Sequence, residues 1–401
     1  MRIPTLEDLG DVAGVRVFVR VDFNVPLAGG AVVDDARIRA SLPTLAELLQ
    51  AGAALVLASH LGRPKGAVVE DLRLGAVAER LRELLVRDVI ALDEVTGPRV
   101  EAACAHLSPG DVVLLENLRF DPREEADDAG FATELAMLAD AYVDDAFGAV
   151  HRPHASVHAL PKTFLGSGRP VVAGRLVQRE IDALSRLLDE PSRPYVAVLG
   201  GAKISDKLAT IGALVERVDA LLIGGAMAFT FIAADGGRIG RSLVEPHRFE
   251  EVRAARERAE RLGVILQLPE DVVVAPERSV EAPHHTVPAV DVPDDEIGLD
   301  IGPGSVKEFA RTIAEARTIL WNGPMGVFEL EPFSAGTRGV ATAIAGASAF
   351  SVAGGGDSLA AVKRYGLEGG FDHLSTGGGA SLEFLGGRKL PGIAVLDGSA
   401  A

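Results

Sequence analysis

Cysteine and aromatic residues are scarce in this chain of 401 residues. Cys104 is the single cysteine, and aromatic residues make up 5% of the sequence. One cysteine excludes an intramolecular disulfide and a zinc site built from cysteines. A chain without disulfides fits a reducing compartment, so we expect a cytoplasmic protein.

Positive charge is in deficit. Lys and Arg number 40 against 57 Asp and Glu, which gives a formal net charge of −17. An acidic protein repels the phosphate backbone of nucleic acids on average, so we expect no nucleic-acid partner. Local groups of arginine stand out against this background.

Long apolar runs are missing as well. The longest uncharged stretch, between Arg338 and Asp357, is rich in alanine, glycine and serine. It is typical of a small-residue helix followed by a strand, and not of a membrane span. The start, MRIPTLEDLG, has no basic segment followed by an apolar run, so we expect neither a signal peptide nor a membrane partner.

Short apolar runs recur along the whole chain, each followed by turn residues and an amphipathic stretch. Such alternation predicts a parallel sheet covered by helices on both faces. A single eight-stranded barrel is the alternative, but two distinct sets of motifs favour two domains. The predicted strands are 15–21, 54–59, 112–116, 141–145, 195–200, 220–224, 264–269, 318–322 and 349–354, and clear helical patterns cover 41–51 and 249–262.

Two turn-rich breaks suggest a domain boundary. GSGRP at 166–170 and EPSRP at 190–194 flank an amphipathic helix over 176–188. That helix is either a rigid connector or an ordinary surface helix. We expect four parts, which are an N-terminal domain over 1–170, a connecting helix over 171–190, a C-terminal domain over 191–387 and a tail over 388–401.

Basic residues follow several strand-like runs of the first half. Ligands of open α/β sheets bind beyond the carboxyl ends of the strands, and arginine suits phosphate and carboxylate groups. One arginine or histidine in such a loop is usually solvated or hydrogen-bonded, so the prediction depends on the joint pattern. The candidate anion-binding residues are Arg37, Arg63, Arg119 and Arg152, with His60 and His154.

Two polar residues follow the first predicted strand. Asp22 and Asn24 precede Pro26, and their side chains could accept hydrogen bonds from substrate hydroxyls. The alternative is that they only form a turn, for which both residue types are well suited.

Glycine-bearing turns follow the strands of the second half, at 200–207 (GGAKISDK), 224–226 (GGA), 322–329 (NGPMGVFE) and 354–358 (GGGDS). Glycine lets backbone N–H groups approach phosphate oxygens closely. No segment is a Walker A loop or a dinucleotide fingerprint. Lys203, with Lys207 one helical turn later, could meet a phosphoryl group. Asp357 could either hold Mg²⁺ or cap a helix.

Seven segments, in family order from about residue 16 to about residue 391, resemble the signature motifs of the phosphoglycerate kinase family. Departures are small: Pro153 replaces a small residue before His154, which we therefore leave out of the expected site, and Ser358 stands where threonine is frequent. The segments are VFVRVDFNVP at 17–26, SHLGRP at 59–64, ENLRF at 116–120, LGGAKISDK at 199–207, LWNGPMGVFE at 320–329, GGGDS at 354–358 and STGGGA at 375–380.

The resemblance implies two Rossmann-like three-layer α/β domains whose parallel sheets face across a hinged cleft. The N-terminal domain would bind 3-phosphoglycerate or 1,3-bisphosphoglycerate, the C-terminal domain would bind ATP or ADP with Mg²⁺, and the tail would return to the N-terminal domain. The implied reaction is reversible phosphoryl transfer between 1,3-bisphosphoglycerate and ADP in glycolysis and gluconeogenesis, carried out by a monomer.

Matching motifs carry the family's site onto this sequence. The implied catalytic residues are Arg37 and Lys203, and Asp357 would hold the metal. The implied triose contacts are Asp22, Asn24, Arg37, His60, Arg63, Arg119 and Arg152. The implied nucleotide contacts are Lys203, Lys207, Glu329, Gly355, Gly356, Asp357 and Ser358.

The expected mechanism needs no general base, because the acceptor is a carboxylate that is already ionised at neutral pH. Catalysis would then consist of positioning and electrostatic stabilisation by Lys203, Arg37, Mg²⁺ and glycine N–H groups. Hinge closure would exclude water, with 176–188 and Ser375-Thr376 as hinge candidates. Two other hypotheses are an NAD-dependent oxidoreductase, which lacks its fingerprint here, and a non-enzymatic binding protein, which would not need to keep the charged site residues.

Overall fold

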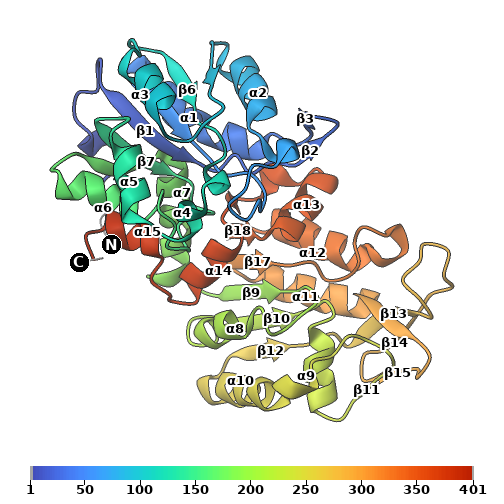
Figure 1. Cartoon of the computed structure of the whole chain (residues 1–401). Helices are drawn as coiled ribbons and strands as arrows, with labels where there is room; N and C mark the ends of the chain where they lie inside the picture. Colours follow the sequence, from blue (N-terminus) through green and yellow to red (C-terminus); the bar gives the residue numbers. More distant parts are fainter. Residues whose placement is uncertain (1–2, 400–401) are drawn as a thin grey trace. The chain divides into compact units, whose positions relative to one another are not determined.

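The computed structural model describes residues 3–399 and contains two compact units. Unit 1 consists of the described residues up to Asp182 together with those from Lys389 onward, and unit 2 is Ala183–Arg388. Each unit is built around a six-stranded parallel sheet (Figure 1), so the predicted α/β class with two parallel sheets is confirmed. Helix α7 (Arg175–Leu188), close to the helix predicted over 176–188, begins in unit 1 and ends in unit 2.

The sheet of unit 1 has the order β5-β6-β4-β1-β7-β8, with every pairing parallel. The first strand lies in the middle, and later strands are added on both sides of it. The order therefore reverses beside β1, between it and β7, which is where such sheets bind ligands. The strands are β1 (Arg16–Val21), β4 (Ala54–Ala58), β5 (Ile90–Ala91), β6 (Val112–Leu114), β7 (Ala141–Asp145) and β8 (Val171–Ala173), and β2 (Leu27–Ala28) and β3 (Ala31–Val32) form a hairpin.

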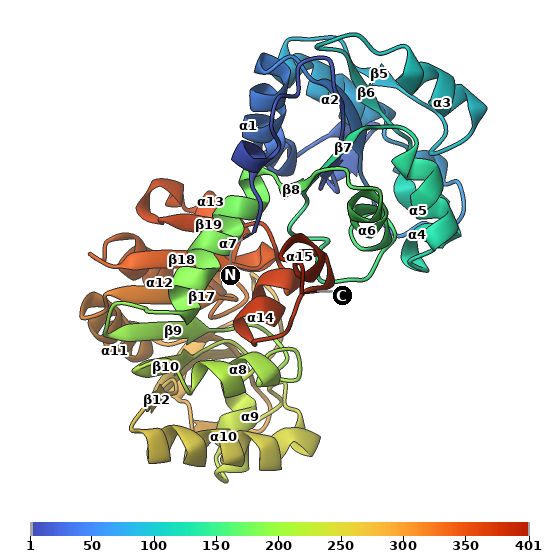
Figure 2. The ribbon, with the colours of Figure 1, turned by 90° about the vertical axis from the view of Figure 1, so that its left-hand side faces the viewer.

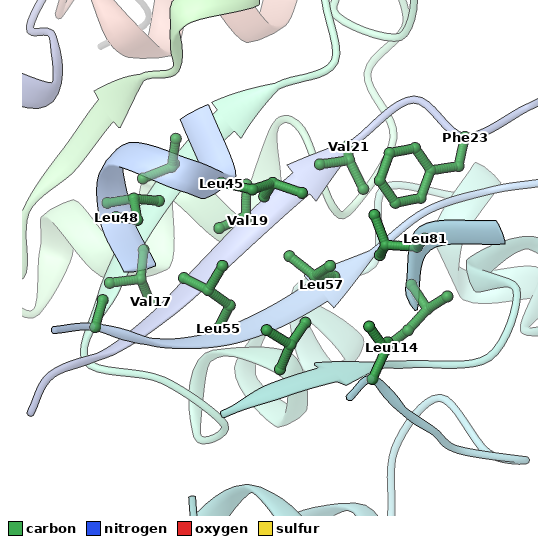
Figure 3. Close-up of a cluster of buried hydrophobic side chains, with 14 of the residues drawn as sticks. Val17, Val19, Val21, Phe23, Leu45, Leu48, Leu55, Leu57, Leu81 and Leu114 are labelled. Atoms are coloured by element: carbon green, nitrogen blue, oxygen red, sulfur yellow. The ribbon is translucent and has the colours of Figure 1, made fainter. Parts of the chain in front are cut away.

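Helices cover both faces of this sheet because alternate residues of its strands are apolar on both sides. Val17 and Val19 pack in one core cluster with residues of α1, while Phe18 stacks on Tyr142, which contacts Phe164 of α6. Figure 3 shows the first of these clusters, with Leu45 of α1 above β1. The helices of unit 1 are α1 (Ala36–Gln50), α2 (Gly75–Leu85), α3 (Pro98–Ala105), α4 (Pro122–Glu125), α5 (Ala129–Ala136), α6 (Ala159–Gly166) and α15 (Pro391–Leu396), with 3-10 turns at η1 (Leu6–Asp8), η2 (Glu70–Leu72) and η3 (Leu118–Phe120).

The last helix, α15, packs on α6 and β8 of unit 1. The Gly392 N–H donates to the Val150 carbonyl at 2.9 Å. A Cβ at Gly392 would lie 2.9 Å from the Val150 Cβ, so glycine permits this close approach of the C-terminal segment.

The sheet of unit 2 has the order β12-β10-β9-β17-β18-β19 and is also parallel throughout. Counted along the chain this is 3-2-1-4-5-6, the order of dinucleotide-binding folds, and it reverses between β9 and β17. The strands are β9 (Tyr195–Leu199), β10 (Ala220–Ile223), β12 (Ile265–Gln267), β17 (Thr318–Asn322), β18 (Phe350–Gly354) and β19 (His373–Ser375).

The helices of unit 2 form two sets: α8 contacts α10 and α14, and α11 contacts α12. Figure 2 shows α8 and α10 beside the β12 edge of the sheet. The helices are α8 (Leu208–Leu214), α9 (Ala228–Ala234), α10 (Phe249–Leu262), α11 (Pro303–Ala314), α12 (Ala335–Ala345), α13 (Gly356–Arg364) and α14 (Gly379–Leu385), with 3-10 turns at η4 (Pro246–Arg248), η5 (Glu331–Phe333) and η6 (Glu368–Gly370).

A small antiparallel sheet, β14-β13-β16, is a part of unit 2 that the sequence did not predict. Its outer strand β14 is mostly exposed, so no continuous apolar run marks it. Its strands are β13 (Asp271–Ala275), β14 (His285–Pro288) and β16 (Ile297–Ile301), and β11 (Arg238–Ile239) pairs separately with β15 (Asp291–Val292).

Helix boundaries agree with the sequence patterns to different degrees. Helix α10 spans the predicted 249–262, whereas α1 begins at Ala36, five residues before the predicted start at 41. The Ala36 N–H donates to Asp34 Oδ1 at 3.0 Å, which satisfies one of the unpaired N–H groups of the first turn. Among residues 3–399, no helix is long and apolar enough to cross a membrane.

Candidate functional site

The first cluster of polar groups in unit 1 lies where β1 ends, beside the switch in strand order. Arg37 of α1 donates to Asp22 Oδ2 at 2.8 Å. Asn24 Oδ1 accepts a hydrogen bond from the Gly62 N–H at 2.9 Å, so the loop after β1 is tied to the loop after β4. Asn24 thus ties two neighbouring loops together. Asp22 orients Arg37, which is one of the predicted cations.

Arg119 joins the same loops from η3. Its guanidinium donates to the Gly62 carbonyl at 2.7 Å, and its Nε lies 3.3 Å from Glu125 Oε1 without a hydrogen-bond partner in the described part of the chain. Burial, with the nearby Arg20, lowers the pKa of Arg119. A buried cation with an unused N–H group is well suited to an anionic ligand.

The other two predicted arginines lie differently. Arg63 is exposed and Arg152 is partly buried, and neither forms an ion pair within residues 3–399. Arg152 is close enough to Arg119 and His154 to influence both electrostatically. The structure therefore connects Asp22 with Arg37, and it connects both Asn24 and Arg119 with Gly62, whereas His60 contacts Arg20. Within residues 3–399, Arg63 and Arg152 form no ion pair and keep their guanidinium groups available.

Arg20 is a central residue that the sequence analysis missed. It lies inside β1, is 1% exposed, donates through Nε to Ser156 Oγ at 2.8 Å and contacts His60 Nδ1 at 3.1 Å. Ser156 is held in turn by the fully buried Glu124, whose carboxylate accepts from its Oγ at 2.6 Å and its N–H at 2.9 Å. A charged residue within an apolar strand was the available signal, because a buried charge requires partners.

Both histidines near this cluster are depressed in pKa. Burial, followed by the charge of Arg20, holds the pKa of His60 well below its usual range. Burial, followed by Arg119, lowers the pKa of His154 to about 4. Both side chains are therefore neutral at pH 7, and an anionic ligand would favour their protonation.

The lowered pKa of His154 predicts a loss of stability in mild acid. Between pH 6.5 and pH 4 the unfolded chain binds more protons than the folded chain at His154, so the free energy of unfolding should fall as the pH falls through that interval. From pH 7 to pH 5 we expect a loss of roughly 1–2 kcal/mol at this residue. Urea unfolding of the parent and of His154→Gln at both pH values measures it.

In this experiment the His154→Gln variant should lose less stability than the parent between the two pH values. The matched control is His106→Gln, since His106 is an exposed histidine of the same unit. An equal pH dependence for the parent and the His154→Gln variant would contradict the prediction.

In unit 2 three glycine loops pack backbone against backbone at the switch between β9 and β17. The Gly200 N–H donates to the Asn322 carbonyl at 3.0 Å, and the Gly201 N–H donates to the Pro324 carbonyl at 2.9 Å. A Cβ at Gly200 would lie 2.1 Å from the Pro324 oxygen, and Gly225 has a φ of +65°. Only glycine fits these positions, and the loops present backbone rather than side chains.

The two lysines of this region differ in their environment. Lys203 is exposed in the loop between β9 and α8. Lys207 is buried, and its Nζ donates to the carbonyls of Gly200 and Asn322 at 2.5 and 2.7 Å. Burial lowers the pKa of Lys207 to about 8. Lys207, which was predicted to meet a phosphoryl group together with Lys203, thus donates its hydrogen bonds to the glycine loops.

The start of α13 completes this end of the unit. Gly355 is the N-cap with a φ of +91°, so Asp357 is not the capping residue but lies exposed in the first turn. Ser358 is buried, and its Oγ accepts a hydrogen bond from the Gly323 N–H at 2.6 Å. The helix N-terminus, with Gly356 exposed, favours anions.

A cavity of about 380 Å³ opens beside these loops within unit 2. Its wall combines glycine backbone (Gly201, Gly225) with apolar side chains such as Phe229 and Leu299, and Glu329 and Asp357 also line it. Asp300 in the wall is buried, which raises the pKa of its carboxyl to about 7, and it accepts a hydrogen bond from the Gly336 N–H at 2.7 Å. An apolar slot beside exposed N–H groups suits a nucleotide.

The described residues suit Mg²⁺ only in company with a ligand. No group of three or more His, Cys, Asp or Glu residues within 3–399 could hold a metal by itself. Asp357 offers one exposed carboxylate, which is the kind of donor a hard cation prefers. The remaining donors would have to be phosphate oxygens and water, which is the usual arrangement for Mg²⁺.

Comparisons with known proteins agree with this geometry. The family model described as phosphoglycerate kinase matches residues 6–388. The phosphoglycerate kinase of Moorella thermoacetica is 52% identical over 392 residues, covering 98% of each chain, and that of Salinispora tropica is 54% identical over 406 residues, covering 99% of this chain and 100% of the relative.

Solved structures show the same likeness. The phosphoglycerate kinase of Coxiella burnetii superposes with a TM-score of 0.89 at 38% identity, covering 100% of both chains. That of Pyrococcus horikoshii OT3 gives a TM-score of 0.85 at 33% identity, covering 98% of both chains. With the family match spanning nearly all of its length, the chain belongs to the phosphoglycerate kinase family.

Proposed function

We propose that the cationic cluster of unit 1 binds the triose and that the cavity of unit 2 binds Mg-nucleotide in the reaction of this family. The cationic cluster consists of Arg37, Arg63, Arg119 and Arg152. The reaction is the reversible transfer of a phosphoryl group between 1,3-bisphosphoglycerate and ADP, a step of glycolysis. The observation that carries the assignment of sites is the cavity of unit 2, where glycine backbone, an apolar slot and the N-terminus of α13 meet at the switch in strand order.

The nucleotide is proposed to lie along this cavity with its phosphates toward the glycine loops. Gly355, Gly356 and Ser358 form the start of α13, whose N-terminus favours phosphate. Lys207 would stabilise the loops and add positive charge, and Lys203 would reach the transferring group. Glu329, with its carboxylate at the cavity, would accept hydrogen bonds from the ribose hydroxyls.

The triose is proposed to bind the cationic cluster of unit 1. Its phosphate and carboxylate are anions, and arginine matches both with paired N–H donors. Arg37 would be shared between Asp22 and the ligand, while Arg119, Arg63 and Arg152 have donors left for phosphate oxygens. The remaining predicted contacts, His60 and Asn24, lie among these groups.

The chemistry then needs no general base, because the acceptor carboxylate is ionised at neutral pH. Arg37 and Lys203 would hold the two reacting oxygens in line and balance the charge of the transferring group. Asp357 would hold Mg²⁺ together with the nucleotide phosphates, and the bound ion supplies positive charge on the phosphate oxygens. We also propose a cytoplasmic monomer, since both half-sites are present in one chain.

Asp357→Asn tests the metal assignment. The coupled assay with 3-phosphoglycerate, ATP and a titration of Mg²⁺ should show a Mg²⁺ requirement raised by roughly 10–100-fold, because the variant lacks the carboxylate proposed to hold the ion beside the phosphates. Glu368→Gln, an exposed acid in η6, is the control and should leave the requirement unchanged. An unchanged requirement in the Asp357→Asn variant would move the metal away from this residue.

The same assay tests the proposed function as a whole. Turnover of 3-phosphoglycerate and ATP by the parent chain is the expected result. Absence of turnover with both ligands still bound, measured by calorimetry, would leave a binding protein on the scaffold of this family.

A further inference from the structure

Five charged side chains line the cavity of unit 2, and four of them have a task. Arg241 donates to the Asp295 carbonyl at 2.7 Å and to the Pro276 carbonyl, so it ties two segments together. Asp300 accepts from two backbone N–H groups. Glu329 and Asp357 are assigned above to ribose and metal. Arg278 remains.

Arg278 is held only loosely. It lies in the segment between β13 and β14, and its side chain is 61% exposed. Its Nη2 lies 3.9 Å from Glu329 Oε2, a separation too long for a hydrogen bond, and it makes none within the described residues. The guanidinium is therefore free to turn toward a ligand at little cost.

The neighbours of Arg278 decide which part of a nucleotide it would meet. Asp357 and the glycine loops belong to the phosphates, and Glu329 belongs to the ribose. Arg278 lies beside Glu329 and lines the same apolar slot as Phe229 and Leu299. This places it at the nucleoside end, where the purine base has to lie.

The donor pattern of guanidinium discriminates between purines. Arginine carries only N–H donors. Guanine and hypoxanthine offer two acceptors, O6 and N7, along one edge, whereas adenine offers N7 beside an amino group that is itself a donor. A fork of donors therefore pairs with a 6-oxopurine at both atoms and with adenine at one.

We propose that Arg278 reads this edge of the base and shifts the nucleotide preference of the enzyme toward 6-oxopurine nucleotides, those of guanosine and inosine. The proposal rests on the assignment of the cavity to the nucleotide. It makes Arg278 a specificity-determining residue of the reaction that the family catalyses.

The test measures kcat/KM for ATP, GTP and ITP, with 3-phosphoglycerate in excess, in the parent, Arg278→Ala and Arg278→Lys. In the Arg278→Ala variant the ratio of GTP to ATP should fall by about fivefold or more, since a bidentate arginine contact discriminates by at least that much. ITP should follow GTP, because it shares O6 and N7. The Arg278→Lys variant keeps the charge but lacks the paired N–H donors. Its ratio of GTP to ATP should therefore lie between those of the parent and the Arg278→Ala variant.

Two controls separate this role from others. Arg311→Ala removes an exposed arginine of α11 and should leave all ratios unchanged. The Glu329→Gln variant should lower kcat/KM for all three nucleotides by a common factor, as expected for a ribose contact. Binding of GDP and ADP, measured by calorimetry without triose, should show the same shift in the Arg278→Ala variant as the kinetics.

An equal loss for all three nucleotides in the Arg278→Ala variant would overturn the proposal, because it would assign Arg278 to the ribose or phosphates. Unchanged ratios would overturn it as well. Failure of the underlying assignment gives a different result, because the Glu329→Gln variant would then also keep the kcat/KM of the parent for all three nucleotides.

Discussion

Replacement of Lys203 by alanine should lower the turnover of phosphoryl transfer by a factor of roughly 10²–10³. The side chain is exposed in the loop after β9, beside the glycine backbone that is proposed to hold the phosphates. Within residues 3–399 its exposed side chain forms no ion pair or hydrogen bond, so its loss should remove charge at the transferring group and affect the fold little. The effect should therefore fall mainly on kcat, because the stabilised charge develops in the transition state.

The measurement is the coupled assay with purified protein, ATP, Mg²⁺ and 3-phosphoglycerate. Lys307→Ala, an exposed lysine of α11, serves as the control and should retain the activity of the parent. Thermal unfolding should be the same for all three proteins. Turnover of the Lys203→Ala variant within a few-fold of the parent would keep the reaction and remove Lys203 from its mechanism.

Lys207 should behave differently from Lys203, although the two lysines are close in sequence. Its Nζ donates to two carbonyls of the glycine loops and is buried. A variant at Lys207 would remove the side-chain donor from the Gly200 carbonyl and one of two donors from the Asn322 carbonyl, so losses of stability and of nucleotide binding would be mixed. This is why Lys203 gives the cleaner test.

Local sequence predicted the parallel strands well because each one is a continuous apolar run. The predicted 318–322 and 141–145 coincide with β17 and β7. The antiparallel sheet was not predicted, since β14 is mostly exposed and carries no such run. Patterns of apolar residues therefore predict strands that are covered on both faces better than strands that lie at a surface.

Candidate site residues divide in a similar way. The glycine turns and the basic residues after strands were visible as patterns in the chain. The need for glycine at Gly200 was not, because it arises from the carbonyl of Pro324, which comes much later in the sequence. Arg278 carries no local signal either, because its position beside Glu329 in the cavity arises from the fold.

Replacement of Arg20 by methionine should lower the free energy of unfolding by about 3–5 kcal/mol, the usual effect of leaving a buried charge without its compensating charge. Arg20 is the cation that faces the fully buried Glu124 across Ser156. Without it the carboxylate keeps its burial and loses its main source of positive charge. Methionine has a similar length, so the cavity left behind is small.

Denaturation followed by far-UV circular dichroism measures this loss. Arg16→Met is a matched control in the same strand, because Arg16 pairs with Asp140 at the surface at 2.9 Å. Exposed pairs contribute little, so the Arg16→Met variant should lose less than about 1 kcal/mol. The single tryptophan, Trp321, is buried in unit 2, and its fluorescence reports on that unit separately.

The double variant Arg20→Met/Glu124→Gln identifies the cause of the loss. If an unpaired buried charge destabilises the single variant, then removing the charge of Glu124 should restore part of the stability, with a coupling of at least about 1 kcal/mol between the two positions. Simple addition of the two losses would mean that packing, and not charge, is what Arg20 provides. In that case the orientation of His60, which Arg20 contacts at 3.1 Å, would also have to depend on packing around β1.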